Sequence, residues 1–224
     1  MIESSPFAPQ VLFQLGPLAV SRAVVTTWVL IAALGLVLAR ATRALSDPPG
    51  RGQAVLELLV EGIAGQIEEV MRTPPRPFLP LLGSLFLFVL VANLSALLPG
   101  VQAPTARIET TAALTLVVFA ATHLYGVRAR GVRRYLAHYL EPTPLLLPLT
   151  VLSEITRTFS MMIRLFGNVM SHEMVLAVLL SLAGLLLPVP VMALGLLIGA
   201  IQAYIFAILA TVFVGAAIGA VETG

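Results

Sequence analysis

The sequence predicts an all-α membrane protein that forms a single membrane domain over residues 1–224. It predicts five membrane-embedded helices and one interfacial amphipathic helix, with the last two embedded helices forming a long tilted hairpin. The chain is 58% hydrophobic and 11% charged, which leaves too few charges to cover a soluble domain of this length. Several apolar runs approach the ~20 residues that cross a bilayer. The 13 basic residues, all arginine, flank these runs, which favours a role in membrane orientation over nucleic-acid binding.

The N-terminal part supplies the first span and the amphipathic helix. Residues 1–22 lack the basic region of a cleaved signal peptide. A first span is expected from Ala23 to about Leu38, where arginines and a Pro-Pro-Gly breaker end it. Residues 53–72 repeat polar side chains at spacings of three, four and seven, with apolar residues between them. This pattern indicates a helix that lies at the interface or against other spans.

Two further spans are expected in the middle of the chain, from Phe78 to Leu98 and from Thr110 to Val127. The chain from about Leu149 to Leu187 is helical in pattern and exceeds one perpendicular span. It must therefore tilt strongly, bend or begin outside the hydrocarbon. A last apolar stretch from about Val191 to Ala220 completes a hairpin over residues 149–220.

The arginines also predict the orientation. With the C-terminus in the cytoplasm, residues 40–76 and a basic loop at 128–134 lie inside and hold five and four arginines. Only Arg22 and Arg107 then lie outside, which fits the positive-inside rule. Five crossings place residues 1–22 outside, as an external N-terminus.

The fourth embedded segment carries most of the polar side chains. On a helix with about 100° per residue, four polar residues fall within about 40° of Arg164. These are Arg157, Ser160, Asn168 and Ser171. Glu154 and His172 lie about 80° to one side, and Glu173 lies about 180° away.

Arg164 calls for a functional explanation. Ser160, Ser171 and Asn93, taken singly, are typical of contacts between spans. An arginine near mid-membrane costs about 2.5 to 3.5 kcal/mol on insertion scales, and it cannot escape by losing its proton. It is also too far from a helix end to reach the membrane surface. Because Glu173 is on the opposite face, we expect the partner of Arg164 in another span or another subunit.

Gln202 is the strongly polar residue in the middle of the last segment. If the hairpin turns near Gly184, Gln202 lies at about the depth of Arg164, which is the arrangement we favour. If it turns at Pro188–Pro190, the two residues are offset by several turns unless the longer helix tilts.

Ser160–Glu173, with the sequence SMMIRLFGNVMSHE, resembles the signature of the a subunit of F-type ATP synthases. The resemblance extends to Gln202–Phe206 and, more weakly, to Asn93–Gly100 and Pro104–Ala106. Ser153–Thr158 resembles an alternate bacterial branch of this family. Segment number and orientation match along nearly the whole chain.

The resemblance implies roles for individual residues. The essential arginine of the family falls on Arg164, its channel carboxylate on Glu173, and its last-span glutamine on Gln202. The family carries a histidine and a glycine, in either order, at the positions of His172 and Gly195. This makes His172 a channel candidate.

The chain departs from the family at both ends of the implied pathway. Many members have Asp and Asn where this chain has Arg107 and Glu109. Another family carboxylate falls on Thr150, and Glu154, one turn later, is its candidate substitute.

The resemblance implies a non-catalytic stator subunit with two offset half-channels, which carry protons or Na⁺ to and from the carboxylates of a rotating c-ring. Glu173, His172 and Gln202 would line the outer half-channel, and Glu154 and Arg157 would lie toward the cytoplasmic exit. The implied partners are the c-ring, b-type peripheral stalk subunits and the catalytic head, in a bacterial inner membrane, with no cofactor, metal or nucleic acid. The alternative is a stand-alone secondary transporter with an intramembrane arginine. Inverted repeats would favour it, and the sequence has none that we can detect.

Overall fold

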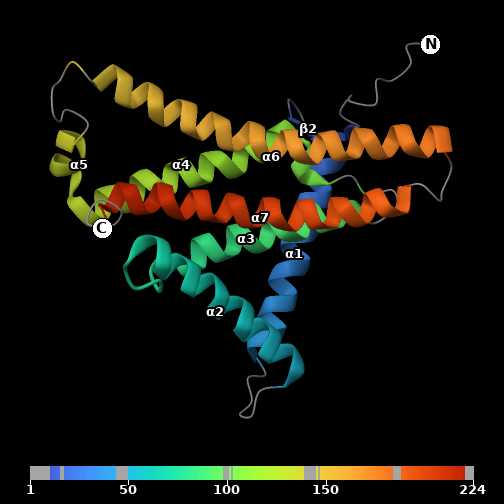
Figure 1. Cartoon of the computed structure of the whole chain (residues 1–224), viewed down its shortest axis with the longest axis horizontal. Coiled ribbons are helices and arrows are strands. Elements are labelled where there is room, and N and C mark those ends of the chain that lie inside the picture. Colours follow the sequence, from blue (N-terminus) through green and yellow to red (C-terminus); the bar gives the residue numbers. More distant parts are fainter. Residues whose placement is uncertain are drawn as a thin grey trace.

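The computed structural model describes residues 11–15, 18–43, 50–97, 101, 103–138, 145, 147–183 and 188–219. Within these ranges the regular secondary structure is helical apart from one small pair of strands (Figure 1). The helices are α1 (Arg22–Arg43), α2 (Arg51–Met71), α3 (Leu79–Leu94), α4 (Ile108–Arg130), α5 (Val132–His138), α6 (Leu147–Ala183) and α7 (Pro188–Ile218). Short 3₁₀ turns occupy Ser95–Leu97 and Pro104–Ala106.

The strand hairpin is a departure from the all-α prediction. Strands β1 (Val11–Leu15) and β2 (Leu18–Ser21) pair antiparallel, with Leu15 opposite Leu18. The sequence between them is Gly-Pro, a turn signal. Both strands fall within residues 1–22, which were predicted to form an external N-terminus.

Helix α7 is the centre of the bundle and packs against α2, α3, α4 and α6. Its buried residues include Ala203, Phe206, Ala210 and Val214. Small residues at such positions let helix backbones approach closely, which favours packing between helices in a membrane. Helix α6, which bears most of the predicted site residues, is one of the helices that pack against α7.

Four of the five predicted membrane-embedded segments contain a long apolar helix. Within the described residues, α1, α4, α6 and α7 are long and apolar enough to cross a membrane. The expected span at 78–98 instead contains α3, which has 16 residues and then tightens into a 3₁₀ turn. Asn93 and Ser95 lie at this end, and the Ser95 hydroxyl donates to the carbonyl of Ala92 at 2.7 Å. Such local bonds compete with continuation of a helix.

The amphipathic helix expected at 53–72 is α2. It buries Ile67 and Met71 and leaves its glutamates exposed. It ends at Arg72, which has a left-handed backbone (φ 52°) and lies just before two prolines in the sequence.

The predicted basic loop at 128–134 is largely helical. Helix α4 continues to Arg130 and ends at Gly131, which has φ 77°, and α5 follows. A positive φ of this kind favours glycine. Tyr135 of α5 lies so close to Gly126 of α4 that a Cβ on Gly126 would overlap its ring.

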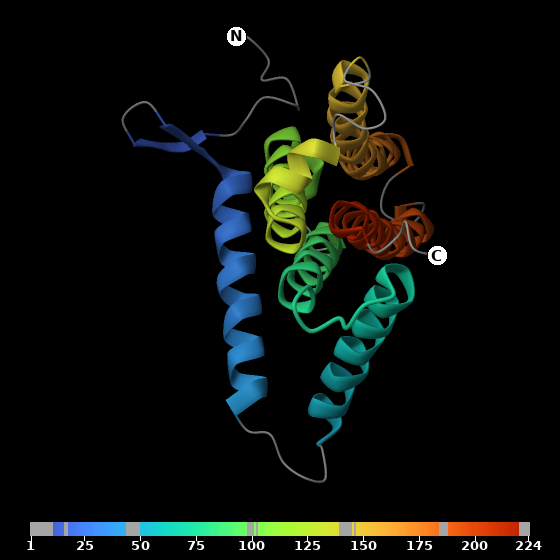
Figure 2. The same ribbon diagram turned by 90° about the vertical axis from the view of Figure 1, so that its left-hand side faces the viewer.

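Helices α3, α4, α6 and α7 run side by side, and α1 runs across them (Figures 1 and 2). Helix α6 has 37 residues, which corresponds to about 55 Å and exceeds a hydrocarbon core of about 30 Å. The C-terminal ends of α4 and α7 meet, because Arg130 donates to the carbonyl of Ala216 at 3.3 Å. The start of α3 lies at the same end, where the Tyr125 hydroxyl donates to the carbonyl of Pro77 at 3.1 Å.

Candidate functional site

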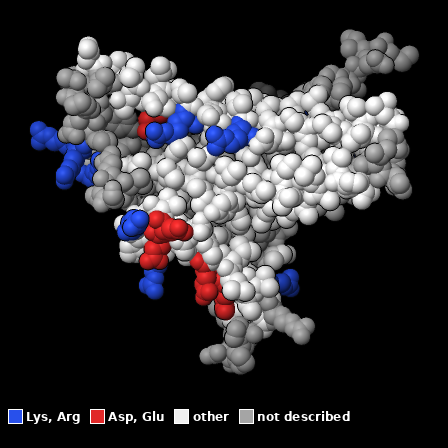
Figure 3. Space-filling view, viewed as in Figure 1, with Lys and Arg blue, Asp and Glu red and all other residues white. Residues whose placement is uncertain are grey.

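Helix α6 has two faces of different character. Met161, Leu165 and Val169, spaced four residues apart, are buried against the bundle. The adjoining face is exposed and carries the polar stripe that the sequence predicted, namely Arg157, Ser160, Arg164, Asn168 and Ser171. The surface over α6 is otherwise almost free of charge (Figure 3). A polar stripe on the outer face of an apolar helix is costly in lipid, so this face is suited to a partner or to water.

Arg164 is exposed on this stripe. Within the described part of the chain, the structure gives its guanidinium no hydrogen bond or ion pair. Glu173, the nearest carboxylate on the C-terminal side in the sequence, is half-buried on the other face of α6 and bonds elsewhere. The cation is therefore held on the outer surface of the bundle without a counter-charge from these residues.

Asn168 connects α6 to α7. Its side-chain amide donates to Oε1 of Gln202 at 2.6 Å, and Gln202 is only 3% exposed. Asn168 is one helical turn beyond Arg164, so Gln202 lies about 6 Å along the axis from the level of the arginine. The favoured hairpin turn near Gly184 falls at residues 184–187, which lie outside the described residues.

A cavity of about 40 Å³ lies between α3, α6 and α7, beside this bond. It has room for a few water molecules. Its polar lining consists of Asn93, Asn168, His172, Glu173 and Gln202. Three of the predicted site residues on α6 and the one on α7 therefore meet around one small space.

Glu173 and His172 are fixed in this cavity by different contacts. Oε1 of Glu173 accepts the backbone N–H of Ala103 at 2.9 Å. His172 lies against α7 at Gly195, where a Cβ would overlap the imidazole ring. The structure thus gives a steric reason for pairing a histidine with a glycine at these two positions.

Asn93 supports the cavity from α3. Its amide nitrogen donates to the carbonyl of Gly199 at 2.8 Å, and its Oδ1 accepts the Thr105 hydroxyl at 2.6 Å. A Cβ on Gly199 would lie 3.0 Å from the Cβ of Asn93, so a glycine permits this close approach. One buried amide therefore connects α3, the 3₁₀ turn before α4, and α7.

A second, smaller cavity of about 10 Å³ lies on the other side of Arg164 along α6. Glu154, Thr158 and Met161 line it from α6, together with Thr115 and Thr122 of α4 and Phe213 of α7. It has the volume needed for about one water. Arg157 lies near it, with its guanidinium carbon 5.2 Å from the centroid of the Phe213 ring, within the range of a cation–π contact.

The structure thus separates the predicted residues into three groups. His172, Glu173, Gln202 and Asn168 surround the larger cavity, Glu154 lines the smaller one, and Arg157, Ser160 and Arg164 lie on the exposed stripe. From the sequence, Asn93 was interpreted as a contact between spans. Its amide side chain within an apolar run is the signal that could have indicated a residue lining the cavity. The Ala103 N–H could not have been found, because a backbone group has no residue identity.

Four long apolar helices and a polar site built between helices define this chain as a multi-pass membrane protein. Within the described residues, no group of three or more His, Asp or Glu side chains is placed to hold a metal ion.

Comparison with known proteins identifies the family. The family model described as ATP synthase A chain matches residues 24–215. The chain is 57% identical over 223 residues to ATP synthase subunit a 2 of a Bradyrhizobium species, which covers 100% of both chains. It is 45% identical to ATP synthase subunit a 2 of Acaryochloris marina, over 92% of this chain and 89% of the relative. Identity to the protein of that name in Pelobacter propionicus is also 45%, over 95% and 93%.

The chain therefore belongs to the ATP synthase A chain family. It is a subunit of the membrane sector of an F-type ATP synthase and a non-catalytic component of that complex. It is a multi-pass protein of a bacterial membrane.

Proposed function

We propose that this chain is the stator subunit through which ions reach and leave the carboxylates of a rotating c-ring. The observation that carries the proposal is the exposed arginine on α6. Arg164 sits on a polar stripe that faces away from the bundle, and the described residues offer it no carboxylate. A carboxyl on a moving neighbour would supply the missing counter-charge.

Arg164 would act by electrostatics. A deprotonated carboxylate cannot face lipid at an acceptable cost, whereas a protonated one can. At ~4 Å and an effective dielectric constant of ~20, a guanidinium attracts a carboxylate by roughly 4 kcal/mol. That attraction corresponds to about three pKa units, which is enough to make an arriving acid release its proton. If the coupling ion is Na⁺, the same attraction would displace the metal ion from the ring carboxylate.

Two half-channels would meet the ring on either side of Arg164. The larger cavity, with Glu173, His172 and Gln202, would belong to the outer one, and Asn168 would border it beside the arginine. The smaller cavity, with Glu154, would belong to the cytoplasmic one, with Arg157 and Ser160 nearby. The two carboxylates are about 14 and 15 Å from Arg164 along the helix axis. This separation supports a barrier to direct ion flow at the arginine.

The proposed orientation places the C-terminus in the cytoplasm and the N-terminus outside. It is supported by the contacts at one end of the bundle, where Arg130 meets the last turn of α7 and Tyr125 meets the start of α3. The arginines at 128–134 follow at this same end, as the positive-inside rule requires. The proposed partners are the c-ring, b-type peripheral stalk subunits and, through them, the catalytic head.

Site-directed cross-linking tests the proposed contact with the ring. The chain has no cysteine, so single cysteines can be introduced cleanly. In the assembled complex, Ser160→Cys and Ser171→Cys should each cross-link to a small ring subunit through a thiol-directed photoreactive reagent. Leu165→Cys is the matched control, because Leu165 lies on the same helix and is 0% exposed. Equal yields from all three positions, or cross-links to lipid alone from the exposed ones, would contradict the proposal.

A further inference from the structure

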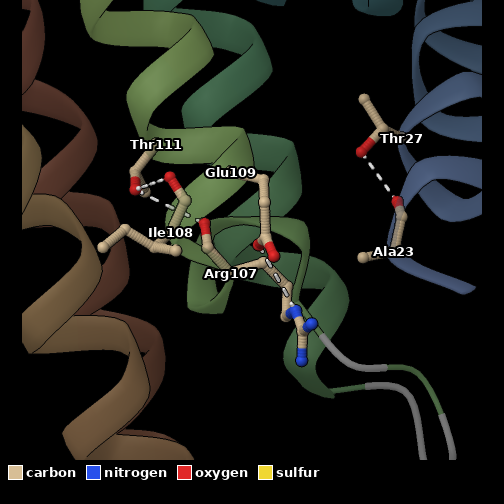
Figure 4. Close-up of polar contacts among 6 residues, drawn as sticks. All are labelled: Ala23, Thr27, Arg107, Ile108, Glu109 and Thr111. Atoms are coloured by element: carbon tan, nitrogen blue, oxygen red, sulfur yellow. Dashed lines mark hydrogen bonds and ion pairs between the residues drawn. The ribbon is translucent and has the colours of Figure 1, made fainter. Parts of the chain in front are cut away.

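Arg107 lies at the start of α4, directly after the 3₁₀ turn Pro104–Ala106. Its Nε is 3.6 Å from Oε2 of Glu109 (Figure 4). The Arg107 side chain is 19% exposed and that of Glu109 is 68% exposed. The ion pair therefore joins a mostly buried cation to a carboxylate that faces the surroundings of the bundle.

The same segment holds Glu173. The backbone N–H of Ala103, four residues before Arg107, donates to Oε1 of Glu173, and the turn that contains it packs against α6. Arg107 directly follows this turn, which brings its positive charge to the side of the cavity where Glu173 is bonded. Arg107 is thus paired with an exposed carboxylate at the surface and belongs to the segment that bonds the half-buried carboxylate in the cavity.

The other groups around Glu173 leave Arg107 as its main charged neighbour. From α3 and α7, the cavity is lined by Asn93, Met192 and Gln202, which carry no charge. From α6 itself, His172 is the titratable neighbour in the lining. On the side of α4, Arg107 and Glu109 are the charged residues that follow the turn bonded to Glu173 through the Ala103 N–H.

We propose that Arg107 is an electrostatic gate for ion uptake at Glu173, and that Glu109 sets the strength of this gate. The proposal rests on the proposed function, because it takes Glu173 as a site that receives the external ion. Arg107 and an arriving cation compete for the Glu173 carboxylate. Glu109 draws the guanidinium toward itself and so weakens that competition. Arg107 acts through Glu173 and is a positioning residue for the ion.

The gate predicts opposite effects for its two members. Arg107→Gln removes the competitor, so Glu173 should bind the external ion more tightly. Glu109→Gln removes a carboxylate that competes for Arg107, so Arg107 should act more strongly on Glu173 and ion binding should weaken. The double variant should behave like Arg107→Gln, because Glu109 acts only through the arginine. A change of about one pKa unit, or about tenfold in the half-saturating ion concentration, is the expected size for a partly screened charge at this range.

The test uses the whole complex in liposomes, with ATP synthesis measured at a fixed membrane potential. The initial rate is recorded against external pH and, in a separate series, against external Na⁺, to identify which ion responds. Arg107→Gln should lower the half-saturating concentration of the coupling ion and Glu109→Gln should raise it. Arg107→Lys should retain the wild-type half-saturating concentration, because it keeps the positive charge. Arg128→Gln, an exposed arginine at the far end of α4, is the matched control and should not shift it.

The outcomes separate the gate from a structural role. If Arg107→Gln and Glu109→Gln both lower the maximal rate and leave the half-saturating concentration unchanged, the pair only supports the fold and the gate is refuted. Shifts in the same direction would refute it as well. If either result is obtained but transport still depends on Arg164, only the gate is refuted and the proposed function stands. Coupled transport that is insensitive to Arg164 would instead remove the proposed function itself.

Discussion

The contact between His172 and Gly195 gives a quantitative prediction. A Cβ on Gly195 would overlap the imidazole ring, so Gly195→Ala forces either the ring or α7 to move. Overpacking of this kind typically costs about 1 to 3 kcal/mol. Both residues line the larger cavity, so the displacement should also slow ion transport.

The overlap should be relieved by removing the ring. His172→Ala in the Gly195→Ala background should recover most of the lost stability, which corresponds to a coupling energy of at least about 1 kcal/mol in a double-mutant cycle. The assay is the thermal midpoint for loss of the subunit from the purified complex, measured together with the rate of ATP-driven ion pumping. Recovery of stability without recovery of the rate would show that the imidazole also serves in transport.

Gly35→Ala is the control for this cycle. Gly35 lies in α1 with no atom within 4 Å of an added Cβ, so this change should not lower the midpoint. The reasoning would be refuted if Gly195→Ala behaved like Gly35→Ala, or if His172→Ala made the Gly195→Ala complex less stable.

Three further changes test other contacts. Asn93→Leu removes the hydrogen bonds to Gly199 and Thr105. At roughly 0.6 to 1.7 kcal/mol for each interhelical bond, the loss of stability should be about 1 to 3 kcal/mol and should lower the thermal midpoint. An unchanged midpoint would contradict this. Gln202→Leu leaves the Asn168 amide without its acceptor, and coupled pumping should fall more than thermal stability, whereas equal losses would indicate a packing role alone. Arg130→Gln removes a cation from the C-terminal end of α7 and should lower the stability of the complex by about 0.3 to 1 kcal/mol. Added salt should reduce this effect. A loss of stability that does not depend on salt would contradict the electrostatic role of Arg130.

The sequence predicted the order of the helices because each long apolar run is bounded by arginine, proline or glycine. It also predicted that the polar side chains of α6 share one face, since residues three, four and seven apart lie on the same side of a helix. The α-helical part of the predicted span at 78–98 ends at Leu94, and a 3₁₀ turn continues to Leu97. Its apolar run continues to Leu98, but the polar side chains at Asn93 and Ser95 bond locally or to other segments and end the helix sooner.

The contacts that assemble the larger cavity were beyond sequence reasoning. The Ala103 N–H that fixes Glu173 depends on how a turn is placed against α6, and no side-chain pattern encodes that placement. The overlap that requires glycine at 195 depends on the rotation of α7 about its own axis. The resemblance to a family indicated that His172 and Gly195 form a pair, and the packing of the two helices supplies the physical reason.

The most direct test of the account is ATP-driven ion pumping by the complex that carries Arg164→Ala, measured in sealed vesicles together with passive ion leak. The account predicts that pumping is lost, or that ions leak through the membrane sector without turnover, because no fixed cation separates the two half-channels. Arg128→Ala, which removes an exposed arginine outside the polar stripe, should pump and seal normally. Normal coupled pumping by Arg164→Ala, with no added leak, would contradict the central claim.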